Sequence, residues 1–157
     1  MKIKLICVGK TTSSHLIAGE NEYLKRLKHY SSLEKIEIPE LKNAKKLSEK
    51  EIKNQEGTLI LKKIDSTDYV ILLDENGKDY TSLEFSKFIQ KRLNSGAKTV
   101  VFLIGGAYGF SDEIYSRAQA KIALSKMTFS HQMVRMFFLE QVYRVFTILK
   151  GQPYHHQ

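Results

Sequence analysis

Residues 100–110 read VVFLIGGAYGF, a run of five apolar residues followed by a glycine-rich turn. The apolar run shows no alternation of polar and apolar residues, which is typical of a strand buried on both faces. Glycines then break the run, and the sequence Ser111-Asp112-Glu113 is a typical start of a helix. A strand, a turn and a helix in this order predict one unit of an α/β fold.

Similar apolar runs occur along the rest of the chain. We predict buried strands over residues 2–8, 33–38, 69–73 and 121–124. We predict helices over residues 14–29, 46–64, 81–94 and 130–149, with a short one from Ser111. Capping boxes begin at Ser48 and Thr81, and residues 74–77 (DENG) predict a turn. The alternation predicts a three-layer α/β domain over residues 1–157, with a parallel sheet covered on both faces.

Composition narrows the class of protein. The chain has 157 residues, 42% of them hydrophobic, and none of its apolar runs approaches the length of a membrane span. Its first residues, MKIKLICVGK, are too short and too charged for a secretory signal. Cys7 is the single cysteine, so we expect a buried thiol rather than a disulfide. We therefore expect a cytoplasmic protein without a membrane partner.

Charge indicates a polyanion as partner. The formal net charge is +8, and residues 1–64 carry 14 Lys and Arg against 8 Asp and Glu. Solvated helix faces are the alternative explanation for any single lysine cluster. The stretch between Glu113 and Glu140 has no acidic residue but contains four basic ones, Arg117, Lys121, Lys126 and Arg135.

Two nucleotide-binding motifs are only superficially present. Residues 8–12 (VGKTT) contain the GKT of a phosphate-binding loop, but Lys4 stands where that motif requires its first glycine. The glycines of residues 105–109 follow G-G-x-x-G rather than G-x-G-x-x-G, and no acidic residue lies about 20 positions further on. The sequence therefore argues against an ATPase and against an NAD-binding protein.

The ends of three predicted strands mark a candidate ligand site. Leu73, Gly105 and residues 124–129 all follow the carboxyl ends of predicted parallel strands, where ligands bind in open α/β sheets. Glycine allows close approach to the backbone, while leucine, methionine and phenylalanine supply apolar walls. Such a pocket suits an adenosine-like ligand. Taken alone, the glycine turn is equally compatible with a purely structural bend.

The last predicted helix is apolar around almost its whole circumference. A helix of this kind must be buried on more than one side. We therefore expect one side to cover the sheet and another to meet a second subunit in a two-fold homodimer. A central helix within one subunit is the alternative.

Three segments carry a family resemblance: LIGGAYGF (residues 103–110), LSKMTFSHQMVRMFFLEQVYR (124–144) and PYHH (153–156). They closely resemble the ribosomal large-subunit methyltransferase H family, and the resemblance extends over essentially the whole chain. It implies a SPOUT-class enzyme with a C-terminal trefoil knot. It also implies S-adenosylmethionine-dependent methylation of N3 of a pseudouridine in helix 69 of 23S rRNA. A protein this small offers little surface for reading RNA, so we expect the assembled ribosome rather than free RNA as the substrate, and we expect no metal.

The resemblance also implies site residues. The donor-binding positions fall on Leu73, Gly105, Leu124, Ser125, Lys126, Met127, Thr128 and Phe129. The subunits form a homodimer, and the C-terminal tail of one completes the site of the other. This chain has Ser130 where the family often has proline, and it ends in Tyr154-His155-His156-Gln157 where many members end in a basic residue.

Several side chains within these segments could perform the chemistry. Loss of the N3 proton calls for a base, and His131 and His155 are the candidates, with Tyr154 as a residue that could stack on a base. The alternatives are that His131 bonds to the backbone at a helix start, that His155 lies in a disordered tail, and that Tyr154 only anchors the tail. Arg135 and Arg144 are candidates for RNA phosphate, with Glu140 as the other possible partner of Arg144. Methylation of another RNA such as tRNA and a non-catalytic ribosome-binding module remain rival functions.

Overall fold

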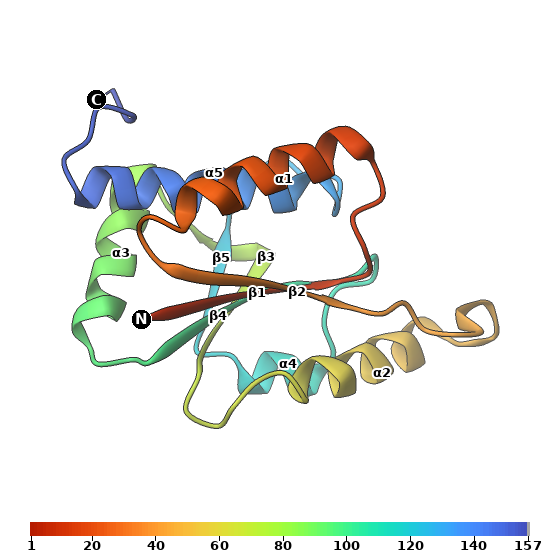
Figure 1. Cartoon of the computed structure of the whole chain (residues 1–157). Helices are drawn as coiled ribbons and strands as arrows, with labels where there is room; N and C mark the ends of the chain where they lie inside the picture. Colours follow the sequence, from red (N-terminus) through yellow and green to blue (C-terminus); the bar gives the residue numbers. More distant parts are fainter. Residues whose placement is uncertain (157) are drawn as a thin grey trace.

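The computed structural model describes residues 1–156, so the predicted role of the tail at Gln157 lies outside the described residues. Its centre is a five-stranded sheet in which every pairing is parallel, with strand order β2-β1-β4-β3-β5 (Figure 1). The strands are β1 (Lys2–Val8), β2 (Ser32–Ile38), β3 (Tyr69–Asp79), β4 (Thr99–Ile104) and β5 (Ala120–Ala123). The predicted parallel sheet is therefore confirmed.

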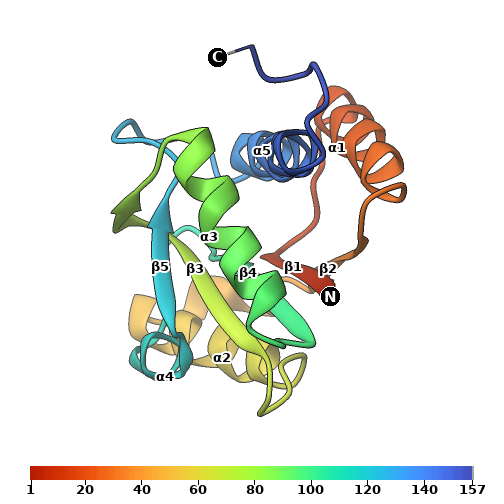
Figure 2. The same cartoon turned by 90° about the vertical axis from the view of Figure 1, so that its left-hand side faces the viewer.

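Helices cover both faces of the sheet. One layer contains α1 (Ser14–Leu27), α3 (Ser82–Asn94) and α5 (Met133–Leu149), as Figures 1 and 2 show. The opposite layer contains α2 (Glu49–Leu61) and α4 (Asp112–Arg117), and a 3-10 turn, η1 (Ala44–Lys46), precedes α2. The predicted three-layer α/β architecture is thus confirmed.

The position of β4 within the sheet explains why its sequence does not alternate between polar and apolar residues. Val100 and Phe102 of β4 belong to the core under α1, α3 and α5, whereas Val101 and Leu103 belong to the core on the α2 side. All four are completely buried, because each face of the strand meets a layer of helices. Cys7 of the neighbouring β1 is equally buried, as expected for a structural thiol.

Side-chain caps fix two helix starts as predicted. The Ser48 hydroxyl accepts a 3.1 Å hydrogen bond from the Glu51 amide at the start of α2. At the start of α3, Thr81 and Glu84 form the complete capping box, with the Glu84 carboxylate accepting from the Thr81 amide at 2.8 Å. These bonds satisfy amide groups that have no partner within the helix.

Several predicted boundaries are wrong, and the helix predicted over residues 46–64, for example, spans Glu49–Leu61. Residues 74–77 do not end β3. Leu73 pairs with Ile122 of β5, the register then shifts over residues 74–77, and Lys78 pairs with Ile122 again. Gly77 makes this excursion possible, since an added Cβ would lie 2.5 Å from the carbonyl carbon of Ile122. The last helix begins at Met133 rather than at residue 130.

The environment of α5 removes one argument for a dimer. Figure 2 shows α5 between α1 and α3, with the sheet beneath it, and α5 contacts both helices. Its apolar circumference is therefore largely explained by neighbours within the same chain, which is the alternative stated above. Met133, 41% exposed, and the half-buried Phe137 are among the apolar side chains that remain only partly covered. Within residues 1–156, none of the helices is long and apolar enough to span a membrane.

Candidate functional site

A pocket of about 410 Å³ lies where β3, β4 and β5 end. Its volume is within the range of roughly 300–1,000 Å³ that is typical of small-molecule sites. The lining comes from the three strand ends and the segments after them: residues 73–76, 104–110, 123–125 and 127–129, with Tyr115, His131 and Val134. The convergence of strand ends expected from the sequence is therefore observed.

Seven of the eight predicted donor-binding residues meet in this pocket. Leu73 and Gly105 lie on two of its walls, and Leu124, Ser125, Met127, Thr128 and Phe129 form a third. Among the described residues, Lys126 is the one member of the set that does not line the pocket. Met127 is 77% exposed, so this wall offers an apolar side chain to whatever enters.

The glycine turn is tightly folded. The Gly109 amide donates to the Gly106 carbonyl at 3.1 Å, and Gly109 has φ +83°, a left-handed conformation that favours glycine. A Cβ on Gly105 would lie 3.2 Å from the Phe110 ring, so the turn packs closely on its own aromatic residue. The backbone of this turn is thus held at the pocket wall by both geometry and packing.

Glu56 of α2 lies beneath the glycine turn and was missed by the sequence analysis. A Cβ on Gly106 would lie 2.8 Å from its Oε2, so the carboxyl group touches the turn from behind. Glu56 is only 9% exposed, and within residues 1–156 its Oε1 has no hydrogen-bond partner. Burial raises the pKa of this carboxyl group. A glutamate on an amphipathic helix gave no signal that it would point inward.

The pocket also has an acidic edge. The Tyr115 hydroxyl donates a hydrogen bond to Asp74, whose other carboxylate oxygen accepts from the Asn76 amide at 2.8 Å. Burial and the hydrogen bond to Asp74 raise the pKa of Tyr115 to about 12. Asp74 and Glu75 both line the pocket, so this part of its wall is negatively charged. Positively charged ligands are favoured there.

The candidate bases lie at opposite ends of α5. His131 lines the pocket just before the helix, whereas Tyr154 and His155 follow its far end. Tyr154 and His155 contact Glu140 and Arg144, partway along α5, and neither residue lines the pocket. Within one chain, the structure therefore does not place the tail in the pocket.

The tail folds back on the last turns of α5. Tyr154 donates to Glu140 at 3.0 Å, and the Arg144 guanidinium lies 4.9 Å from the centre of the Tyr154 ring. Arg144 also pairs with Glu140, as the alternative in the sequence analysis anticipated. Burial, followed by hydrogen bonds to Tyr23 and Glu140, raises the pKa of Tyr154, so its hydroxyl remains protonated.

The tautomer of His155 follows from its neighbour. Nη1 of Arg144 lies 3.1 Å from Nδ1 of His155. A guanidinium only donates hydrogen bonds, so Nδ1 of the neutral ring accepts and its proton lies on Nε2. Among the described residues this Nε2 is buried without a partner.

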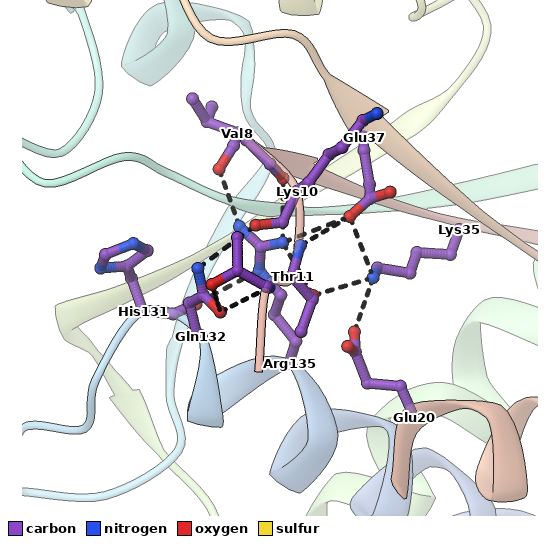
Figure 3. A network of polar contacts seen from close by, with 11 residues as sticks. Val8, Lys10, Thr11, Glu20, Lys35, Glu37, His131, Gln132 and Arg135 are labelled. Carbon is purple, nitrogen blue, oxygen red and sulfur yellow. Dashed lines mark hydrogen bonds and ion pairs between the residues drawn. The ribbon is translucent and has the colours of Figure 1, made fainter. Parts of the chain in front are cut away.

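The expectation that Arg135 contacts RNA phosphate is contradicted. Its side chain is completely buried, and it donates to the carbonyl oxygens of Val8 and Gly9 and to the Thr11 hydroxyl (Figure 3). The sequence placed an arginine on an apolar helix and suggested an anionic partner, but backbone carbonyls can satisfy a guanidinium equally well. A side chain with no exposed surface cannot reach RNA from this position.

The described residues contain no group of three or more His, Cys, Asp or Glu side chains arranged to hold a metal ion. The pocket lining combines backbone and apolar side chains with Asp74, Glu75 and His131, two tyrosines, the Asn76 amide and the hydroxyls of Ser125 and Thr128.

The chain is similar to known proteins over essentially its whole length. Residues 1–155 match the family described as "Predicted SPOUT methyltransferase". The chain is 57% identical over 157 residues to proteins named "Ribosomal RNA large subunit methyltransferase H" from Christiangramia forsetii and Flavobacterium johnsoniae, with complete coverage of both partners. A protein of the same name from Cytophaga hutchinsonii is 55% identical over 156 residues, which are 99% of this chain and all of the relative.

Proposed function

Because this chain belongs to the SPOUT methyltransferase family, we propose that it transfers a methyl group from S-adenosylmethionine to N3 of a pseudouridine in helix 69 of 23S rRNA. The observation that carries the proposal is the pocket at the ends of β3, β4 and β5, which gathers seven of the eight donor-binding candidates. The names of the relatives support large-subunit rRNA as the substrate. The trefoil knot implied by the family is part of the same proposal.

The pocket suits the donor in shape and charge. Apolar side chains and the backbone of residues 105–109 offer packing and main-chain hydrogen bonds to an adenosine group, and Asp74 and Glu75 complement its positive charges. When bound, S-adenosylmethionine supplies a methyl group on a positively charged sulfur, and the electrons of the broken bond stay with that sulfur. Leu73, Gly105 and residues 124–129 would hold it.

The acceptor nitrogen must lose a proton before or during methyl transfer. His131 lies on the pocket wall, so we assign it to accept the N3 proton on a ring nitrogen. His155 is the second candidate base, and its Nδ1 lies 3.1 Å from Nη1 of Arg144. Alignment of donor and acceptor by the pocket supplies the rest of the rate enhancement.

A second subunit is the natural source of the tail at each pocket. Within one chain, Tyr154 and His155 lie against Glu140 and Arg144 of α5 and do not line the pocket. We propose a homodimer in which Tyr154, His155 and Arg144 of one subunit face the pocket of its partner, where Arg144 contacts RNA. Partly covered apolar side chains of α5, such as Phe137, are available for that contact.

The net charge of +8 supports binding to an RNA. A chain of 157 residues offers little surface for reading sequence, so we propose the assembled ribosome as substrate and the cytoplasm as the location. Methylation of another RNA such as tRNA is the closest rival. A ribosome-binding module without catalysis is the rival from another class.

Calorimetric titration with S-adenosylmethionine distinguishes a methyltransferase from a ribosome-binding module without catalysis. The enzyme is expected to bind the donor in the micromolar range, about −8 kcal/mol. Gly105→Val fills the pocket wall and should abolish the heat signal, while Gly96→Ala, outside the pocket lining, should retain it. Absence of binding by the wild-type protein, alone or with ribosomes, would exclude catalysis from this pocket.

A further inference from the structure

Arg135 joins the first turn of α5 to the end of β1. Nη2 donates to the Val8 carbonyl at 2.7 Å, and Nη1 donates to the Gly9 carbonyl at 2.9 Å and to the Thr11 hydroxyl at 3.1 Å (Figure 3). Nε donates back to the carbonyl of His131 at 3.3 Å. A planar fork of donors fixes direction as well as distance. The guanidinium therefore holds the backbone of His131 relative to the sheet.

Gln132 makes a second connection beside the first. Its Oε1 accepts from the Thr12 amide at 2.9 Å and from the Thr12 hydroxyl at 3.2 Å. Its Nε2 donates to the Lys10 carbonyl at 3.2 Å. Figure 3 shows Gln132 and Arg135 reaching the same segment from the start of α5. Two side chains three positions apart thus fasten this helix end to residues 8–12.

The hydrogen bonds of Arg135 and Gln132 fix one end of a segment that forms a wall of the pocket. In the described structure, residues 124–132 form neither a helix nor a strand between β5 and α5. They line the pocket at Leu124, Ser125, residues 127–129 and His131. An irregular segment is placed by its two ends, so its shape depends on where Ala123 leaves the sheet and where α5 begins.

A partly buried ion network lies beside Arg135, in which Glu37 is one-third exposed. Glu37 accepts from the Thr11 amide at 2.8 Å and lies 3.7 Å from Nη1 of Arg135. Lys35 lies 3.4 Å from Glu37 and 2.7 Å from Glu20. Two cations and two carboxylates balance one another, which allows a charged arginine to be held inside the protein. Lys35 also donates to the Thr11 hydroxyl at 3.1 Å, the same group that accepts from Arg135.

We propose that Arg135 and Gln132 are positioning residues, which set the place of His131 and of residues 124–129 and thereby the affinity of the pocket for the methyl donor. This inference rests on the proposed function, since it takes S-adenosylmethionine as the ligand. It assigns to the buried arginine a role in the site without contact to donor or RNA.

A matched pair of variants at Gln132 tests the inference. Gln132→Leu removes all three hydrogen bonds, whereas Gln132→Glu keeps both bonds from Thr12. We expect Gln132→Leu to weaken S-adenosylmethionine binding in calorimetry by about tenfold, and Gln132→Glu to stay within about threefold of the wild type. Arg135→Lys, which loses the fork, should weaken binding by more than tenfold and raise the KM for the donor.

Lys4→Met is the control for general destabilisation. It leaves the buried Asp68 carboxylate without its cation near the start of β1, away from the Val8 end that Arg135 contacts, so it should lower the urea midpoint while leaving donor affinity within twofold of the wild type. If Gln132→Leu binds the donor as tightly as Gln132→Glu, the inference is wrong, whether or not Arg135→Lys folds. Wild-type protein that fails to bind the donor would instead overturn the proposed function, so the two failures are distinguishable.

Discussion

The guanidinium of Arg135 donates a 2.7 Å hydrogen bond to the carbonyl oxygen of Val8, 127 residues earlier in the chain. This bond joins the carboxyl end of β1 to the start of α5, where His131 and Val134 line the pocket. Arg135, which belongs to the stretch without acidic residues, therefore binds groups inside the protein. Stability and ligand binding are therefore linked at this point, and each can be measured separately.

Lys35→Met is expected to lower the free energy of unfolding by about 3–5 kcal/mol, because it leaves a buried carboxylate without its partner. Glu20 is 2% exposed and has Lys35 at 2.7 Å. Urea unfolding at pH 7 measures the effect. The double variant Glu20→Met with Lys35→Met removes both charges and should recover most of the loss. A loss below 1 kcal/mol in the single variant would show that the pair contributes little.

Gly77→Ala is expected to displace residues 74–77 from β5. The added Cβ would lie 2.5 and 2.6 Å from the carbonyl carbon and amide nitrogen of Ile122, and backbone atoms cannot move aside cheaply. We expect a loss of about 1–3 kcal/mol in stability. Donor binding should weaken too, because Asp74, Glu75 and Asn76 line the pocket.

Gly96→Ala is the control for this change. Gly96 has φ +78° but no atom within 4 Å of an added Cβ, so strain alone should reduce stability by about 1–2 kcal/mol. Donor affinity should not change. Equal donor affinity in both variants would contradict the role given to Gly77.

Glu56→Gln is expected to stabilise the protein increasingly as pH rises. Burial raises the pKa of Glu56 above its ordinary value of 4.5, so the folded protein holds this proton more tightly than the unfolded chain. The corresponding stabilisation is complete below pH 4.5 and is lost as pH rises through the folded-state pKa. A neutral glutamine does not undergo this loss.

Thermal unfolding at several values from pH 4.5 to 8 measures the difference between Glu56→Gln and the wild type. The gain of the variant should grow across this range. Glu49→Gln, an exposed position on the same helix, should show no such growth. A constant difference for Glu56→Gln would mean that its carboxyl group titrates at the same pH in both states.

The tail is expected to be required for methylation and not for donor binding. His155→Ala, or removal of residues 152–157, should abolish methyl transfer while leaving the calorimetric affinity for S-adenosylmethionine within about threefold. Mixing the truncated chain with Gly105→Val should restore roughly a quarter of wild-type activity, because half of the dimers are mixed and each contains one complete site. Without restoration, the tail would not act in the partner subunit.

Local patterns in the sequence predicted much of this architecture. The apolar runs gave the strands, and the caps at Ser48 and Thr81 gave two helix starts, because both signals depend on residues close together in the chain. The pocket followed from the rule that parallel strands end at one edge of a sheet. The places of Leu73, Gly105 and Leu124 around it agree with that rule.

Long-range contacts could not be predicted in the same way. Nothing near Arg135 in the chain reveals that its partners are Val8, Gly9 and Thr11. Glu56 looks like any polar residue of an amphipathic helix until Gly106 is placed against it. The excursion at residues 74–77 has the composition of a turn, and only pairing with β5 shows that the strand continues. Each of these features depends on tertiary contacts between distant segments.

Mass spectrometry of 23S rRNA tests the central claim most directly. Ribosomes from cells that lack this gene are incubated with the purified protein and isotopically labelled S-adenosylmethionine, and the rRNA is digested and analysed. We predict that untreated ribosomes lack one methyl group on N3 of a pseudouridine in helix 69, and that the protein restores it with the label. A pseudouridine already methylated in those cells, or label on any other nucleotide, would contradict the account.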